Sequence, residues 1–279
     1  MEMDDSGKSR CLRLRQMMRE VYATLGKGYP EGSLDMPENG ELHVYPMTAI
    51  DEITSRTPDA LYNGVAVMQI IQSCVPGIKD PWQISALDVD TVLLAIRAAS
   101  GNGSIELETT CPKCKEISNY SLEIPRLLAS LKAADYDSEL QISDLYIKFI
   151  PIKFKEINEA GLAQFELTKS FTSLTEAQTE EEKLQISQNA LKAITELTMD
   201  IVAKGIEYIR TPNVTVTERE HIMDFLRNCD RNTYIKIRDY STELKSKSEL
   251  QPIKFKCDAI ECGNEYEQSI QLNPSDFFG

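Results

Sequence analysis

The segments Cys111-Pro112-Lys113-Cys114 and Cys257-Asp258-Ala259-Ile260-Glu261-Cys262 decide the fold. Each holds two cysteines separated by two or four residues, a spacing that is found in structural zinc sites. Each pair also lies between two segments that read as β-strands, because β-branched and apolar residues alternate there with polar ones. These segments are residues 105–110, 117–124, 253–256 and 266–272. The sequence therefore predicts a zinc ribbon that is split into two halves.

Cys111, Cys114, Cys257 and Cys262 are predicted to bind one Zn2+ together. The ordinary signature places its two pairs about 12–20 residues apart. Here 142 residues lie between the pairs, so the fold has to bring them together. Four thiolates fill a tetrahedral shell and leave no position for water, so the ion is expected to be structural and not catalytic. Isolated reduced thiols and a transient dithiol remain as alternatives, although a redox pair prefers the start of a helix to a loop between strands.

The composition is typical of a globular protein and excludes several classes. The chain of 279 residues is long enough for one large domain or two smaller ones. Hydrophobic residues make up 42% and charged residues 27%, which argues against a disordered protein. The formal net charge of -14 opposes general binding to DNA, RNA or anionic lipid.

The sequence predicts neither a membrane span nor a secretory signal. Its longest uncharged stretch, residues 60–78, contains seven polar or turn-forming residues. The acidic and then basic N-terminus has no apolar segment that could serve as a signal peptide. We therefore expect folding in a reducing cytoplasm, where the paired spacings among the seven cysteines indicate metal binding more than disulfides.

An α+β fold in four parts is predicted. Residues 1–40 form an N-terminal basic arm and linker, and residues 41–103 a helical region. Residues 104–124 and 251–275 form the split zinc ribbon, and residues 125–250 a mostly helical insertion with a β-hairpin at its start. The arm carries Arg10, Arg13, Arg15 and Arg19. A solvated helix face is the simpler interpretation of these arginines, and contact with a phosphate or an acidic partner is the alternative.

Capping motifs mark four predicted helix starts. They are Thr48 with Asp51, Ser85 with Asp88, Thr175 with Gln178, and Thr217 with Glu220. Within the insertion, helices are predicted over residues 154–174, after Thr175 to about residue 209, after Thr217 and over 232–247. The second of these rests on an apolar stripe that includes Ile201 and Ile206.

The sequence offers no combination of residues that predicts catalysis. His43 and His221 are isolated, and neither triad spacing nor a glycine-rich phosphate loop is present. The remaining cysteines, Cys11, Cys74 and Cys229, are single, and a buried thiol is the simpler interpretation for the last two. The protein is therefore predicted not to be an enzyme.

An ordered set of short segments precedes and includes the first cysteine pair. The segments are Pro46–Glu52, Pro58–Gly64, Ser73–Pro76, Asp80–Pro81, Leu87–Asp90, Ala95–Arg97 and Cys111–Cys114. This set resembles the T4-type tailed-phage baseplate protein family over about residues 41–275, in the group of hub subunits and hub assembly proteins. The resemblance implies a non-enzymatic part of a contractile tail baseplate. It also implies that the family's cysteine pairs correspond to Cys111, Cys114, Cys257 and Cys262.

The expected partners are other baseplate and tail proteins, with the oligomeric state set by the assembly. The expected location is the virion tail baseplate, and the host cytoplasm during assembly. Two alternatives remain open. A transient tail assembly chaperone that is absent from the mature virion would share every feature of this sequence. A zinc-ribbon nucleic-acid-binding adaptor would need a basic face, but acidic residues near the cysteine pairs outnumber Lys113, Lys115, Lys254 and Lys256.

Overall fold

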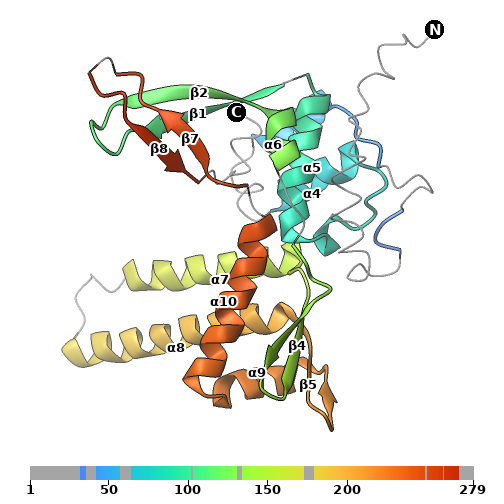
Figure 1. Cartoon of the computed structure of the whole chain (residues 1–279), viewed down its shortest axis with the longest axis vertical. Helices are drawn as coiled ribbons and strands as arrows, with labels where there is room; N and C mark the ends of the chain where they lie inside the picture. Colours follow the sequence, from blue (N-terminus) through green and yellow to red (C-terminus); the bar gives the residue numbers. More distant parts are fainter. Residues whose placement is uncertain are drawn as a thin grey trace. The chain divides into compact units, whose positions relative to one another are not determined.

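The computed structural model describes residues 32–35, 42–56, 64–101, 103–130, 134–172, 179–248, 250–259 and 261–269. The chain divides into two compact units (Figure 1). The first unit comprises Met1–Ala134 with Lys245–Gly279, and the second comprises Asp135–Leu244, so the second is inserted in sequence into the first. Helices combined with small antiparallel sheets confirm the α+β class. Most of the predicted arm and linker, and the cap predicted at Thr175, lie outside the described residues.

The helical part of the first unit packs around two helices. Its elements are α2 (Ala49–Ser55), α4 (Val65–Cys74), the 3-10 helix η2 (Pro81–Gln83), α5 (Ala86–Ala99) and α6 (Ile124–Ser130). Helices α4 and α5 contact each other, and both contribute buried side chains to the core. These include Val67, Ile70, Ile71, Leu93, Leu94 and Ile96. Each such side chain stabilises the fold by about 1.5–3 kcal/mol relative to an exposed position.

Two predicted helix starts are confirmed in this unit. At α2, the Thr48 hydroxyl accepts a hydrogen bond from the Asp51 N–H, and the Asp51 carboxylate accepts one from the Thr48 N–H at 2.8 Å. The Ser73 hydroxyl also donates to Asp51, at 3.1 Å, so this buried carboxylate has several partners. At α5, the Ser85 hydroxyl accepts from the N–H of Leu87.

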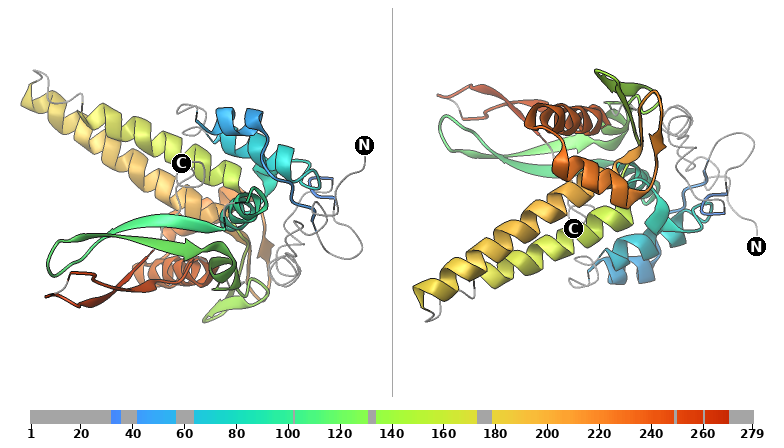
Figure 2. Two further views of the ribbon diagram at one scale, coloured as in Figure 1. Left: turned by 90° about the horizontal axis from the view of Figure 1, so that it is seen from above. Right: turned by 90° about the horizontal axis from the view of Figure 1, so that it is seen from below.

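Two β-hairpins belong to the first unit as well. They are formed by β1 (Ser104–Thr110) with β2 (Ile117–Glu123), and by β7 (Ile253–Lys256) with β8 (Glu265–Gln268). Both are antiparallel, and Figure 2 shows them side by side. On β1, Ile105 and Thr109 are buried while Glu106 and Glu108 are exposed, which is the alternation that the sequence predicts.

The second unit contains a four-stranded antiparallel sheet in the order β3-β4-β5-β6. Its strands are β3 (Glu139–Ile142), β4 (Leu145–Phe149), β5 (Ile206–Arg210) and β6 (Thr215–Val216). The predicted hairpin corresponds to β3 and β4, whereas β5 and β6 were not predicted. The ring of Phe149 lies 5.3 Å from that of Tyr240 on α10, so one face of the sheet packs against this helix.

Four helices accompany this sheet. They are α7 (Phe154–Thr172), α8 (Glu180–Lys204), α9 (Arg219–Asn228) and α10 (Arg231–Ser248), which begins in the second unit. Helices α7 and α8 run antiparallel, side by side (Figures 1 and 2). The predicted extents of α7 and α10 agree approximately with the structure. The predicted end of α8 and the predicted start of α9 do not.

The long predicted helix ends five residues earlier than expected. Helix α8 stops at Lys204, and Ile206, which had been placed on the helical stripe, begins β5. Ile206 and Ile209 are both buried, and their spacing of three residues imitates a helix. In the structure this spacing results from a register shift opposite Lys148 and Phe149, where β5 carries one extra residue.

The helix start predicted at Thr217 is also wrong. Helix α9 begins at Arg219, and its N-cap is Glu218, whose backbone is extended. The Glu218 side chain makes no capping hydrogen bond. The capping motif is recognised from residue types alone. It cannot show which of two neighbouring residues is the N-cap when that residue makes no side-chain hydrogen bond.

Candidate metal centre

The first cysteine pair occupies a tight loop between β1 and β2. Cys111 directly follows β1, and its N–H donates to the carbonyl of Glu116 at 2.9 Å. The carbonyl of Cys111 accepts from the N–H of Lys115 at 3.0 Å. Lys115 has a left-handed backbone with φ of 64°, which costs a residue other than glycine about 1–2 kcal/mol. The loop therefore turns the chain at the expense of some backbone strain.

The second pair occupies a similar loop between β7 and β8. Cys257 follows β7, and its N–H donates to the carbonyl of Asn264 at 2.9 Å. The N–H of Cys262 donates to the carbonyl of Ala259 at 3.0 Å. Gly263 has a φ of 52°, so glycine supplies the left-handed position without the strain present in the first loop.

Aromatic side chains bring the two hairpins together. The ring centroid of Phe255 lies 4.8 Å from that of Tyr120 on the other hairpin and 6.0 Å from that of Tyr266 on its own hairpin. The Tyr120 hydroxyl donates to the carbonyl of Lys256, and the Tyr266 and Thr109 oxygens lie 2.6 Å apart. The contacts of Tyr120 and Thr109 join β1 and β2 to β7 and β8, and the loops at the ends of the hairpins converge.

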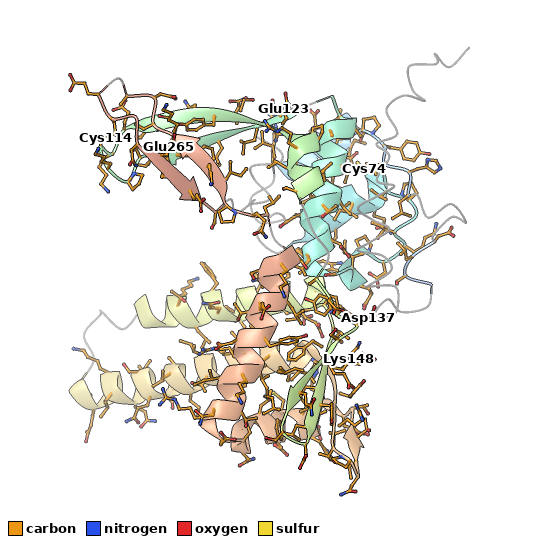
Figure 3. The ribbon with its side chains drawn as sticks, viewed as in Figure 1. Cys74, Cys114, Glu123, Asp137, Lys148 and Glu265 are labelled. Atoms are coloured by element: carbon orange, nitrogen blue, oxygen red, sulfur yellow. The ribbon has the colours of Figure 1, made fainter. Side chains whose placement is uncertain are left out.

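The four sulfur atoms form one compact cluster. All four ligand atoms lie within 4.8 Å of one another. Cys111 Sγ is 3.9 Å from Cys262 Sγ, and Cys114 Sγ is 3.5 Å from Cys257 Sγ. Figure 3 shows Cys114 in its loop, beside the hairpin that carries Glu265. The structure thus brings together all four cysteines on which the sequence prediction rests.

The sulfur separations fit a thiolate-bound metal ion better than disulfides. A disulfide requires about 2.05 Å between sulfurs. Four sulfurs at about 2.3 Å from a tetrahedral zinc ion lie about 3.8 Å from one another. The observed 3.5 and 3.9 Å straddle that value, and each of these contacts joins one loop to the other. A set of four soft sulfur donors suits Zn2+ and other thiophilic ions, and excludes Mg2+ and Ca2+.

The loop N–H groups lower the pKa of both Cys111 and Cys257, whereas the neighbouring thiols lower the pKa of Cys111 and raise that of Cys257. The Cys114 N–H, which has the largest effect, acts together with the Lys113 N–H and the Cys114 and Cys257 thiols to lower the pKa of Cys111 to about 6 against the effect of burial. The N–H of Ala259 acts in the same direction on Cys257. Burial and the other three thiols outweigh it and raise the pKa of Cys257 to about 12. The cluster therefore accepts one negative charge readily and resists further charge that no cation balances.

The other sequence candidates are not part of this cluster. Cys74 is buried on α4, where burial and then Asp51 raise its pKa to about 12. Cys229 is half-buried, and its Sγ contacts the carbonyl of Leu226 at 3.5 Å. His43 and His221 are exposed. Cys11 lies outside the described residues, and the part of the chain that is described contains no second cluster of this kind.

Several residues that shape the centre were not predicted. The amide Nδ2 of Asn264 lies 3.8 Å from Cys111 Sγ, and Thr109 and Tyr266 hold the hairpins together. The only local signal is position: Asn264 lies two residues after Cys262, where a backbone carbonyl closes the loop. The partners of these side chains lie more than 150 residues away in the sequence, so no local pattern reveals them.

A known protein family matches most of the chain. No curated protein and no solved structure matches it significantly. None of the helices within the described ranges combines the length and apolar character that crossing a membrane requires. Residues 33–279 match the family described as T4 bacteriophage base plate protein, a range that includes both hairpins and the whole second unit. The chain therefore belongs to the T4 bacteriophage base plate protein family, whose members are parts of the phage baseplate together with other baseplate proteins.

Proposed function

We propose that this baseplate protein is a non-enzymatic structural or assembly component of the hub region of a contractile phage tail, held rigid by a structural zinc ion. The convergence of the four cysteine sulfurs supports the zinc site. The family match and the ordered segments of the sequence support the baseplate role. The location that follows is the virion tail baseplate, with assembly in the host cytoplasm.

The ligands of the ion are Cys111, Cys114, Cys257 and Cys262 in this proposal. When bound, Zn2+ balances the charge of the thiolates and is saturated by sulfur, which leaves no reactive position. The hydrogen bonds of Tyr120 with Lys256 and of Thr109 with Tyr266 hold the two hairpins together. Binding of structural zinc to small peptides is worth about 10 kcal/mol or more at neutral pH.

A metal ion at this site would connect two segments that are distant in the sequence. The chain leaves the first unit after β2 and α6 and returns to it before β7, with the second unit between. A metal ion shared by the two hairpins joins their loops, which lie at the opposite end of β2 from α6. We propose that residues 125–250 act as an insertion between the two halves of the ribbon, that the ion makes the ribbon rigid, and that this rigid part is recognised by other baseplate proteins.

The exposed charge of the hairpins favours a protein partner over nucleic acid. Exposed acidic side chains cover both hairpins and their loops. They are Glu106, Glu108, Glu116, Glu123, Asp258, Glu261, Glu265 and Glu267. Lys254 is paired with Glu267 at 3.6 Å, so one of the few basic groups is already partly neutralised. A strand of DNA would meet a mostly negative surface here.

The test uses a phage whose copy of this gene is replaced by variants. Purified virions from the wild type should contain the chain in their baseplates, and replacement of all four cluster cysteines by serine should abolish its incorporation. Cys229→Ser, which changes a cysteine outside the cluster, should be incorporated normally. A chain that tail assembly requires but mature virions lack would be an assembly chaperone. Normal tails formed without the chain would refute the baseplate role.

A further inference from the structure

The two cysteine loops share one backbone design. In each, the N–H of the first cysteine donates at 2.9 Å to the carbonyl of the residue two positions after the second cysteine. This acceptor is Glu116 in the first loop and Asn264 in the second. In each, a residue with positive φ lies between the second cysteine and the acceptor. Glu116 and Asn264 therefore occupy equivalent positions in the two halves of the site.

Their side chains behave differently. Glu116 is exposed, and an ionised carboxylate can only accept hydrogen bonds. Asn264 is half-buried, and its amide Nδ2 lies 3.8 Å from Cys111 Sγ, which belongs to the opposite loop. An amide N–H is a donor, and a thiolate sulfur is an acceptor. The two loops therefore differ in one hydrogen bond, which runs from the Asn264 amide across the sulfur cluster to Cys111 Sγ.

We propose that Asn264 is a positioning residue of the metal centre, which donates across the site to the Cys111 thiolate and so strengthens metal binding. This inference rests on the proposed zinc site. The donated bond stabilises the charged sulfur, holds Cys111 Sγ near Cys262 Sγ, and withdraws electron density from the sulfur. Hydrogen bonds to metal ligands of this kind typically change metal affinity by about 10- to 100-fold.

The structure allows the side chain to be tested apart from the backbone. Asn264 contributes its carbonyl to Cys257 N–H as well as its amide to Cys111, and only the amide is lost on substitution. Asn264→Ala removes the donor. Asn264→Asp keeps the shape but replaces the donor with a carboxylate that repels the thiolates. Glu116→Ala is the matched control, because it truncates the equivalent side chain in the other loop.

The experiment uses the full chain, loaded separately with Zn2+ and with Co2+. Competition with a chelator should show about 10-fold weaker zinc binding for Asn264→Ala, a larger loss for Asn264→Asp, and less than about a 2-fold change for Glu116→Ala. In the Co2+ form, loss of the hydrogen bond should shift the sulfur-to-cobalt charge-transfer band to longer wavelength. A purely structural role of Asn264 would not move that band while the tetrahedral d–d bands persist.

Three results would overturn the inference. The first is a zinc affinity and a charge-transfer band of both Asn264 variants that equal those of the wild type. The second is an equal effect of Glu116→Ala, which would make the crossing bond irrelevant. The third is a wild-type chain that binds neither ion, which would refute the proposed zinc site together with this inference, whereas the first two leave the zinc site standing.

Discussion

The phenol oxygen of Tyr266 lies 2.6 Å from the hydroxyl oxygen of Thr109, although the two residues are 157 positions apart in the sequence. Thr109 lies on β1, two residues before Cys111, and is 1% exposed. Tyr266 lies on β8, four residues after Cys262. This hydrogen bond therefore joins the two hairpins close to the sulfur cluster and contributes to their alignment before any ion binds.

Removal of the Tyr266 hydroxyl should weaken this alignment. We predict that Tyr266→Phe lowers the free energy of unfolding of the metal-free protein by about 1 kcal/mol, since the buried Thr109 hydroxyl loses its partner. A double-mutant cycle with Thr109→Val, measured by urea unfolding, should give a coupling energy of about 1 kcal/mol. Additive effects of the two substitutions would show that the hydroxyls do not interact.

Chelation of zinc should destabilise the first unit. A ligand that binds only the folded state at a free concentration a thousand times its Kd stabilises that state by about 4 kcal/mol. Trp82, the single tryptophan, lies in this unit and provides a fluorescence signal for its unfolding. We predict that a strong chelator lowers the thermal midpoint reported by Trp82, and that an excess of Zn2+ restores it. An unchanged thermal midpoint would contradict a stabilising zinc ion in the first unit.

The core of the second unit should be sensitive at β4. Ile147 is 0% exposed, so Ile147→Ala should cost about 2–5 kcal/mol through lost burial and the cavity that remains. Leu191→Ala on α8 is the control, because this side chain is 67% exposed and its loss should change stability by less than about 0.5 kcal/mol. Hydrogen exchange of the amides of β4 and β5 measures both effects. Equal effects of the two variants would contradict the packing of the sheet.

Glu139 should make the stability of the second unit depend on pH. Its carboxylate accepts from the Tyr208 hydroxyl at 2.7 Å and from Arg210 at 2.8 Å, and these bonds lower its pKa below the ordinary 4.5. A lowered pKa stabilises the folded state above the unfolded pKa, and the contribution disappears as the pH falls through the folded value. Glu139→Gln should therefore lower the thermal midpoint by about 2 °C at pH 7 and by less below pH 4. A difference that grows on acidification would contradict this assignment.

The sequence was sufficient where a local pattern carries the information. The alternation of β1 and the caps at Thr48 and Ser85 are local patterns, and the structure contains these three features; the cysteine spacings are local as well, and the four cysteines lie in two loops as predicted. Strand β5 was missed because its register shift gives Ile206 and Ile209 a helical spacing, and the shift exists only relative to β4. The crossing bond from Asn264 depends on the docking of two distant hairpins, which no local pattern encodes. The identity of the metal and the hub location stay predictions.

X-ray absorption at the zinc edge, combined with metal analysis of the purified full chain, is the decisive test of the shared zinc site. We predict one zinc ion per chain with four sulfur neighbours at about 2.3 Å and no nitrogen or oxygen neighbour. A chain that carries no zinc after purification and reconstitution, or zinc with fewer than four sulfur neighbours, would contradict the shared site of Cys111, Cys114, Cys257 and Cys262.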